Sequence, residues 1–392
     1  MPMRLCKTPI CDQRSLEDFC QRAHKQAFVT VDTEFVRERS YYPMLCLVQV
    51  ATSEEAVVID PLAMGLSLEP LFALMQDPLV LKVFHAARQD LEIFFQLSGK
   101  LPVPLFDSQV AAMVCGYGEQ VGYETLVCAL TDKSVDKSNR YSDWSKRPLH
   151  DEQLDYALSD VTHLRQIYQK LSAQLVKNKR DTWVQEEMEI LSNPNTYQVD
   201  VRKVWRKLKG RGDKPRFLAL LRELAAEREI EAQRLNIPRG HLLSDNLVRQ
   251  IAVASPQDQD ALIAIRGLSK KKIQSSFGQK ILNAIKVGQN LPFEQCPDPR
   301  SKNNIKTPEQ QEILSLLKLL LHHKCKQHDV APKLVASSSE LRALIMNESM
   351  DLPLLQGWRH SVFGQDALDL LKGHMQLCVQ QEKLTFHRKE MR

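Results

Sequence analysis

The stretch Val29-Thr30-Val31-Asp32-Thr33-Glu34-Phe35 decides how the first half of the chain is interpreted. Apolar and β-branched residues over 27–31 are typical of a strand, and two acids follow them. Strand side chains alternate between faces, so Asp32 and Glu34 point the same way. Neighbouring carboxylates repel each other, and a divalent cation such as Mg²⁺ or Mn²⁺ would offset that repulsion. A strand that ends in a solvated turn is the alternative.

The size and charge of the chain suit a multidomain protein with a polyanionic partner. The 392 residues are enough for about two to three domains. The formal charge is only +5, but residues 201–290 contain 19 Lys/Arg against 8 Asp/Glu, a net of +11 that leaves −6 for the rest. A basic block beside an acidic domain favours a nucleic acid held by one part and processed by another. A solvated helical surface is the alternative.

The cysteines and the apolar runs indicate a reducing compartment and no membrane span. The nine cysteines are odd in number and form no C-x-x-C pair, which is typical of free thiols. No run approaches 18 uninterrupted apolar residues, and the N-terminus carries no apolar core of a secretory signal. We therefore expect a cytoplasmic protein without a membrane anchor. Monomer is the default expectation.

The first half of the chain is predicted to be a mixed α/β domain. Strands are expected over 27–31, 44–51 and 55–59, and the connections are too short for helical crossovers, so we expect an antiparallel meander. Strand–helix pairs follow at 79–84 with 86–97 and at 103–106 with 108–115. A helix is expected to open at Ser15, a plausible N-cap. Apolar residues over 152–175, mostly leucines, recur at spacings of three and four and predict a long helix with one buried face.

The second half is predicted to consist of two small all-helical domains. We place the first domain at 1–195, the helical domains at 205–290 and 309–385, and a proline-containing linker at 291–308. The triplet Phe277-Gly278-Gln279 recurs as Phe363-Gly364-Gln365, and a helical run follows each copy. These matches favour duplication of one small fold, although chance similarity of short helical segments is the alternative.

Further acids complete a candidate metal site. Asp90 is expected on the first or second turn of the helix that follows the strand ending at Phe84, where α/β sheets place their sites. Tyr156 and Asp160 are four residues apart and share one helix face. Taken alone, an acid at the position of Asp90 is more often a helix-start residue, and the alternative for Asp160 is an ordinary salt bridge to an arginine. Together with Asp32 and Glu34 they supply four carboxylates, a set that suits two metal ions at a phosphodiester.

These motifs, read in order, resemble the DEDD 3′→5′ exonucleases with tyrosine in the third motif. The three motifs are Asp32-Thr33-Glu34, His85 with Asp90, and Tyr156-x-x-x-Asp160. Phe106-Asp107-Ser108-Gln109 and Ser142-Asp143-Trp144-Ser145 narrow the resemblance to the ribonuclease D family. The helical half is similar to tandem HRDC domains, through Asn236-x-Pro238-Arg239 and Ile265-Arg266-Gly267 in the first copy and Gly357-Trp358-Arg359 in the second.

The resemblance implies an RNase H-like mixed-sheet exonuclease domain followed by two HRDC-like helical domains. It also implies residue roles. Asp32, Glu34 and Asp160 would hold one Mg²⁺ or Mn²⁺ ion, and Asp32 and Asp90 would hold a second. Tyr156 would orient the attacking water. Asp107 is interpreted as a helix cap, and His85 as a packing residue.

The substrate class implied by the resemblance is RNA. We expect 3′-tailed structured RNAs, chiefly tRNA precursors, to be trimmed to 5′-monophosphates. Candidate phosphate contacts are Lys137, Arg147 and the run Lys270, Lys271 and Lys272; Lys137 and Arg147 could equally serve loop packing. A DNA exonuclease of the proofreading type is the alternative within the enzyme class, because metal ligands do not distinguish the two sugars. A non-catalytic nucleic-acid-binding protein on this fold would not require all five site residues.

Overall fold

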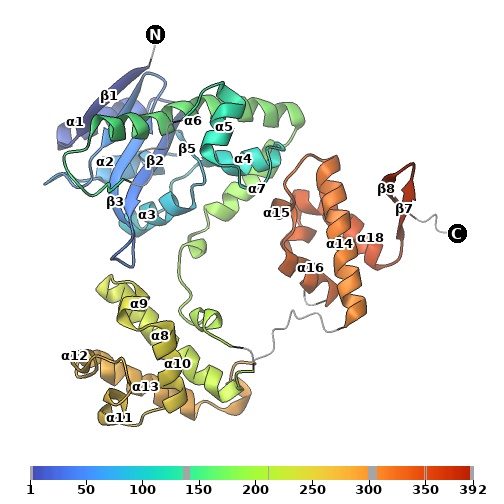
Figure 1. Cartoon of the computed structure of the whole chain (residues 1–392). Helices are drawn as coiled ribbons and strands as arrows, with labels where there is room; N and C mark the ends of the chain where they lie inside the picture. Colours follow the sequence, from blue (N-terminus) through green and yellow to red (C-terminus); the bar gives the residue numbers. More distant parts are fainter. Residues whose placement is uncertain are drawn as a thin grey trace. The chain divides into compact units, whose positions relative to one another are not determined.

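The computed structural model describes residues 3–135, 142–210, 212–298, 307–347, 349 and 351–388. The chain divides into two compact units. One unit comprises Met1–Glu34, Leu45–Thr196 and Asn303–Arg392, and the other comprises Phe35–Met44 and Tyr197–Lys302. Figure 1 shows the elements of both units, coloured along the sequence.

A six-stranded mixed sheet forms the centre of the N-terminal domain. Its strand order is β1-β4-β3-β2-β5-β6. The strands are β1 (Arg4–Ile10), β2 (Phe28–Val36), β3 (Met44–Ala51), β4 (Glu55–Ile59), β5 (Leu81–Phe84) and β6 (Leu105–Asp107). β3 and β4 are antiparallel, while β1 with β4, β2 with β5, and β5 with β6 are parallel. The expected α/β class and the adjacency of the three meander strands are confirmed, and β1 was not predicted.

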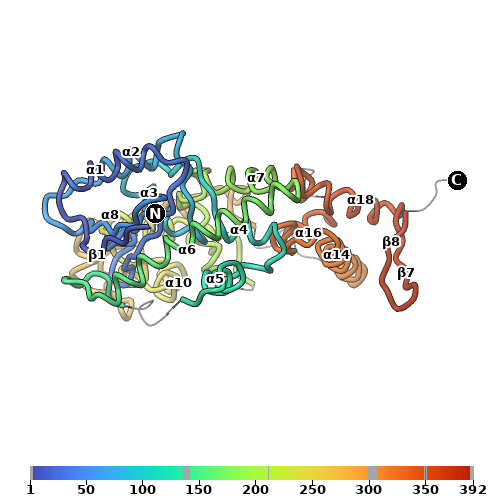
Figure 2. The backbone as a smooth tube through the Cα atoms, turned by 90° about the horizontal axis from the view of Figure 1, so that it is seen from above, coloured from blue at the N-terminus to red at the C-terminus, as the bar shows by residue number. Residues whose placement is uncertain are grey.

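Helices cover this sheet and their ends follow local capping chemistry. The helices of the domain are α1 (Gln13–Ala23), α2 (Glu69–Gln76), α3 (Arg88–Ser98), α4 (Ser108–Val114), α5 (Tyr123–Thr131), α6 (Asp151–Asn178) and α7 (Asp181–Leu191). The long helix α6 packs against β1, β4 and β5, and α1 lies beside α2 (Figure 2). The expected helix start at Ser15 is wrong. Asp12 is the N-cap, and its carboxylate accepts from the Ser15 backbone N–H.

The first helical domain is built around two antiparallel-packed long helices, α8 (Pro215–Leu235) and α13 (Ser276–Asn290). Between them in sequence lie α9 (Arg239–Leu242), α10 (Asp245–Ala254), α11 (Gln259–Ile263) and α12 (Lys270–Ile273), and the short turns η2 (Val204–Lys207) and η3 (Phe293–Gln295) flank the pair. Its core includes Leu221, Ile251 and Phe277, and Tyr41 from residues 35–44 is part of the same cluster. The expectation of an all-helical fold is confirmed for this part.

The C-terminal region is helical and ends in a hairpin. Its elements are α14 (Pro308–Gln327), α15 (Pro332–Val335), α16 (Ser338–Ile345), η4 (Pro353–Leu355), α17 (Gly357–Arg359), the π-turn His360–Gly364 and α18 (Gln365–Leu371). The expected all-helical fold does not extend to its end, because β7 (Met375–Gln380) and β8 (Lys383–Arg388) form an antiparallel pair. Gln381 and Glu382 both have positive φ (50° and 60°), as a two-residue hairpin turn requires.

The two Phe-Gly-Gln triplets play the same structural part in their respective domains. Phe277 and Phe363 are both buried in the local core. A Cβ added at Gly278 would lie 1.8 Å from the carbonyl oxygen of Ile273, and one at Gly364 would lie 2.3 Å from that of Leu354. In both copies, therefore, the glycine lets a helix start press against the backbone of the preceding turn. The shared contact supports the predicted duplication. Among the described residues, no helix is long and apolar enough to cross a membrane.

Candidate active site

Three carboxylates meet where the central strand faces the long helix. Asp32 and Glu34 come from β2 and Asp160 comes from α6. One ligand oxygen from each lies within 4.8 Å of the other two. Asp160 is buried, while Asp32 and Glu34 are half-buried. The alternation of β2 and the i to i+4 spacing on α6 thus bring the predicted acids together. Three hard oxygen donors at this separation suit a divalent cation such as Mg²⁺ or Mn²⁺.

The electrostatics of the carboxylates call for a positive charge. Burial raises the pKa of Asp32 to about 6. Burial, followed by the charge of Asp32, raises the pKa of Asp90 well above its ordinary value. Both shifts have the sign expected when acids are desolvated together without a counter-ion. A bound cation would favour the ionised forms and reverse the shifts, so the donor set fits a metal centre.

Asp90 reaches this region from a different direction than the other acids. It lies in the first turn of α3, as predicted, and is 6% exposed. Its carboxylate lies outside the trio of Asp32, Glu34 and Asp160, and it accepts a hydrogen bond from the Thr33 hydroxyl. Thr33, which sits between the two acids of β2, was not singled out from the sequence. Strand alternation points it away from the acids, and only tertiary structure reveals its bond to Asp90.

Tyr156 lies at the acidic cluster as a neutral phenol. Burial, and then the charges of Asp160, Glu34 and Asp32, raise the pKa of Tyr156 above its ordinary value. Its ring stands 6.1 Å from that of Trp144, centroid to centroid. Trp144 is only 2% exposed and therefore belongs to the packing around Tyr156. A phenol held protonated among carboxylates can position a water molecule by hydrogen bonds, and because it stays protonated it does not serve as the base.

A second layer of side chains supports α6 and the start of α3. Tyr123 donates a hydrogen bond to the backbone carbonyl of Asp160. Its ring packs against His85 at 5.3 Å, and His85 Nδ1 lies 2.9 Å from Ser108 Oγ. His85 therefore packs against Tyr123 and Ser108, as expected. Tyr123 was missed because an isolated tyrosine at a helix start carries no distinguishing sequence signal.

The Asp107 carboxylate accepts hydrogen bonds from backbone N–H groups at the start of α4 and just before α3. It caps α4 by accepting from the Gln109 N–H at 2.8 Å, which agrees with the predicted role. It also accepts from the N–H groups of Ala86 and Ala87, at 3.0 and 2.8 Å. Ala86 has φ +56°, so the turn into α3 is sharp and these two bonds hold it. Asp107 thereby helps to hold the turn that leads to Asp90.

The candidate phosphate contacts fall into three groups. The Arg147 guanidinium is bound within the fold: it donates to both Asp60 carboxylate oxygens at 2.7 Å and to the Cys46 carbonyl at 2.6 Å. Of the two roles expected for Arg147, these contacts match loop packing. Lys137 lies outside the described residues. Lys270 and Lys271 are exposed on α12, whereas Lys272 Nζ donates to the His241 carbonyl at 2.6 Å.

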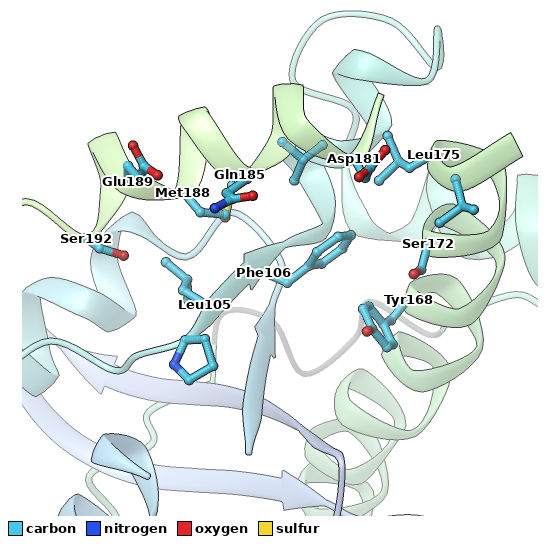
Figure 3. A pocket seen from close by; sticks show the side chains of 13 residues that line it. Leu105, Phe106, Tyr168, Ser172, Leu175, Asp181, Gln185, Met188, Glu189 and Ser192 are labelled. Carbon is cyan, nitrogen blue, oxygen red and sulfur yellow. The ribbon is translucent and has the colours of Figure 1, made fainter. Parts of the chain in front are cut away.

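A cavity of about 380 Å³ lies away from the acids, beside the edge strand β6 and between α6 and α7. Figure 3 shows Phe106, Tyr168 and Met188 lining it. Its lining is mainly apolar and includes none of the five predicted catalytic residues. The cavity is therefore separate from the candidate active site.

The fold and the acidic site place the chain in a known class, which comparison with known proteins bears out. A family model described as "3'-5' exonuclease" matches residues 8–176, and one described as "HRDC domain" matches residues 217–285. The class is thus that of 3′→5′ exonucleases with an appended helical domain. The ribonuclease D of Gluconacetobacter diazotrophicus is 48% identical over 94% of this chain and 94% of its own. That of Granulibacter bethesdensis is 47% identical over 95% and 94%. The chain belongs to the ribonuclease D family.

A solved structure agrees with this assignment. The crystal structure of Escherichia coli RNase D, described as an exoribonuclease involved in structured RNA processing, matches with a TM-score of 0.82. The identity is 27%, and the match covers 95% of this chain and all of that one. The chain is therefore a 3′→5′ exoribonuclease with RNA as its substrate class. Its acidic cluster and its family point to a divalent cation. The DNA exonuclease alternative has less support.

Proposed function

We propose that this exoribonuclease trims the 3′ ends of tRNA precursors and other 3′-tailed structured RNAs, one nucleotide at a time, to 5′-monophosphates. The observation that carries the proposal is the approach of Asp32, Glu34 and Asp160 to within 4.8 Å. The structured RNA processed by the E. coli relative supports the substrate class. Residues 1–195 are the proposed catalytic domain, and residues 205–290 and 309–385, joined by the linker 291–308, are the proposed HRDC-like domains, of which the first, with its basic block, would bind RNA.

We propose two divalent cations, Mg²⁺ or Mn²⁺, at this site. Asp32, Glu34 and Asp160 would hold one ion, and Asp32 and Asp90 the other. Such a pair activates a water molecule and stabilises the leaving oxygen of a phosphodiester. Four carboxylates around one small region, two of them with raised pKa values, support this count. The nine unpaired cysteines suit a reducing compartment such as the cytoplasm, with the enzyme acting as a monomer.

The residues of the chain have distinct parts in the reaction. Tyr156 orients the water that attacks the last phosphorus atom of the RNA. The bond from that phosphorus to the 3′ oxygen of the preceding nucleotide breaks, and the oxygen takes up a proton. A 5′-monophosphate leaves, and the shortened RNA again ends in a 3′ hydroxyl. Replacing Tyr156 with Phe keeps the ring against Trp144 and removes only the hydroxyl, so we expect a loss in kcat of about 100-fold, the scale of a lost positioning or proton-transfer contact.

A time course on a 3′-tailed tRNA precursor tests the proposal. The reactions contain Mg²⁺, Mn²⁺ or EDTA, with a single-stranded DNA of matched sequence as a second substrate. We expect stepwise loss of RNA from the 3′ end with either metal and none in EDTA. Asp32→Asn should abolish the loss, and Asp155→Asn, an exposed acid on the same helix as Asp160, should not. Preferential shortening of the DNA, or RNA shortening that survives EDTA, would contradict the proposal.

A further inference from the structure

A small pocket in the first helical domain is built from the two sequence segments that carry its HRDC resemblance. The pocket encloses about 210 Å³ between two segments of this domain. One is residues 240–244, the end of α9 and the first turn after it, which directly follow Pro238-Arg239, and the other is the turn 267–269, which begins at the glycine of Ile265-Arg266-Gly267. Leu247, Ile273 and Phe277 supply its apolar wall. Neither segment belongs to the acidic site, and the catalytic function described above does not use the pocket.

The pocket is held in shape by contacts within the domain. Lys272 Nζ donates to the carbonyls of His241 at 2.6 Å and Leu242 at 3.3 Å, so α12 is tied to the turn on the opposite side. Gly267 has φ +96°, and a Cβ there would stand 3.3 Å from Leu247 Cδ2. Only glycine therefore satisfies the turn without strain and without pressing on the wall. These contacts make the pocket a preformed feature of the fold.

The surroundings of the pocket are basic. His241 lines it, and Arg266, Lys270 and Lys271 are exposed beside the second turn. The acid next to the first turn, Asp245, is paired with buried Arg228 at 2.7 Å, which offsets its charge. A polyanion could therefore contact these basic residues at the mouth of the pocket while an apolar group attached to it enters the pocket and contacts the apolar wall. Without the pocket, the exposed lysines would contact only the charged backbone of the polyanion.

The size of the pocket limits the kind of ligand that it can hold. Pockets for drug-sized ligands measure roughly 300–1,000 Å³, so about 210 Å³ admits a single flat ring system. Single-stranded RNA presents such rings along an anionic backbone, and proteins bind it by combining base contacts with basic residues. We propose that this pocket holds one unpaired nucleobase of the single-stranded part of the RNA, while Arg266, Lys270 and Lys271 contact the flanking phosphates. The proposal rests on the RNA-trimming function above.

The test couples a change in the RNA to a change in the pocket. Full-length Asp32→Asn protein, which should not cut, is titrated with a tRNA-like hairpin carrying a single-stranded 3′ tail, and binding is followed by fluorescence anisotropy. One tail position at a time is made abasic. We expect one internal position at which loss of the base weakens binding about tenfold, within the range for a stacked base. Filling the pocket with Leu247→Phe should weaken the intact tail and remove the sensitivity at that position.

Two further variants separate the base contact from charge and from folding. Circular dichroism would reveal whether Leu247→Phe unfolds the domain. His241→Ala removes a side chain that lines the pocket and serves as a second test: it should reduce the loss of binding that an abasic tail position causes. Lys270→Ala with Lys271→Ala should weaken all tails equally and lower the salt dependence of binding. The pocket proposal would be overturned if an abasic position weakened binding to Leu247→Phe and to His241→Ala as much as it weakens binding to the protein with an unchanged pocket. Tight RNA binding without any cutting by the unmodified chain would instead count against the trimming function.

Discussion

The hydroxyl of Tyr41 donates a hydrogen bond to the carboxylate of Glu229, 188 residues further along the chain. Tyr41 lies in the segment that follows strand β2, seven residues after Glu34, and it is 7% exposed. Glu229, on α8, is fully buried and also accepts from Arg239 at 3.2 Å. The Tyr42 N–H donates to the Asn236 side chain at 3.0 Å. The HRDC-like residues Asn236 and Arg239 therefore serve to anchor residues 35–44.

We predict that Tyr41→Phe destabilises the helical unit by about 1–3 kcal/mol, the cost of leaving a buried acceptor with one partner fewer. The ring stays in the core, so the change isolates the hydroxyl. Urea unfolding followed by circular dichroism measures it. Tyr117→Phe is the matched control, since its half-buried hydroxyl bonds Gln174 at 3.1 Å in the other unit. If Tyr41→Phe lowers the free energy of unfolding no more than Tyr117→Phe does, the hydrogen bond from Tyr41 to Glu229 does not stabilise the fold to the predicted extent.

Metal removal should lower the stability of the wild type much more than that of a site variant. In EDTA at pH 8, we predict that Asp32→Asn raises Tm, because it removes an ionised carboxylate from a buried position, where burial already raises the pKa of Asp32 to about 6. With Mg²⁺ the wild type should gain about 2.7 kcal/mol at a concentration 100 times Kd, and the variant should gain much less. Differential scanning fluorimetry with and without Mg²⁺ checks both signs. Equal gains in the two proteins would rule out Asp32 as a ligand.

The bond between Thr33 and Asp90 predicts a further functional residue. Thr33→Val keeps the shape of the side chain and removes the donor, so Asp90 loses a partner and its carboxylate is held less firmly. We expect kcat on tailed RNA to fall about five- to tenfold, equivalent to about 1 kcal/mol for one hydrogen bond, with little change in KM. Thr33→Ser retains the hydroxyl and should restore most of the rate. If Val and Ser variants are equally active, the hydroxyl has no role in placing Asp90.

How far the sequence predicts the molecule depends on whether a feature is local. The alternation of Asp32 with Glu34 and the i to i+4 spacing of Tyr156 and Asp160 are set by backbone geometry, and the acids meet as expected. Strand β1 was missed, because its parallel partner β4 lies 45 or more residues away and its residues show no clean alternation. The pairing of Arg147 with Asp60, 87 residues apart, likewise follows from tertiary structure alone.

The C-terminal region shows the same limit. Trp358 and Arg359 were recognised as an HRDC-like feature, yet their partner on α7 could not be read from sequence. Arg359 forms an ion pair with buried Glu187 at 2.6 Å, and the Trp358 ring stacks on Trp183 at 4.6 Å with an interplanar angle of 11°. The indole N–H of Trp358 also donates to Glu187 at 3.2 Å. These residues therefore fasten the C-terminal helices to α7.

Breaking this ion pair should be costly. Arg359→Ala leaves Glu187 buried beside one remaining donor, and removing one partner of a buried pair costs about 3–5 kcal/mol. Lys318→Ala, an exposed change on α14, should cost less than about 0.5 kcal/mol. Chemical unfolding of both variants gives the comparison. The double variant Glu187→Gln with Arg359→Met should recover part of the loss, since no charge then stays unpaired; failure to recover would show that packing dominates.

Glu231 predicts how the stability of the first helical domain responds to acid. Hydrogen bonds from Arg234 and Lys280 outweigh its burial and lower its pKa to about 2, against 4.5 for an ordinary glutamate. Because the folded state holds the proton less tightly than the unfolded state, the contribution of Glu231 is complete above pH 4.5 and is lost as the pH falls toward 2. Glu231→Gln should therefore lower stability at pH 7 and flatten its decline between pH 4.5 and 2. Unfolding curves across that range measure the slope. Glu227→Gln on the same helix should keep the slope of the wild type, and an unchanged slope in Glu231→Gln would contradict the assigned ion pairs.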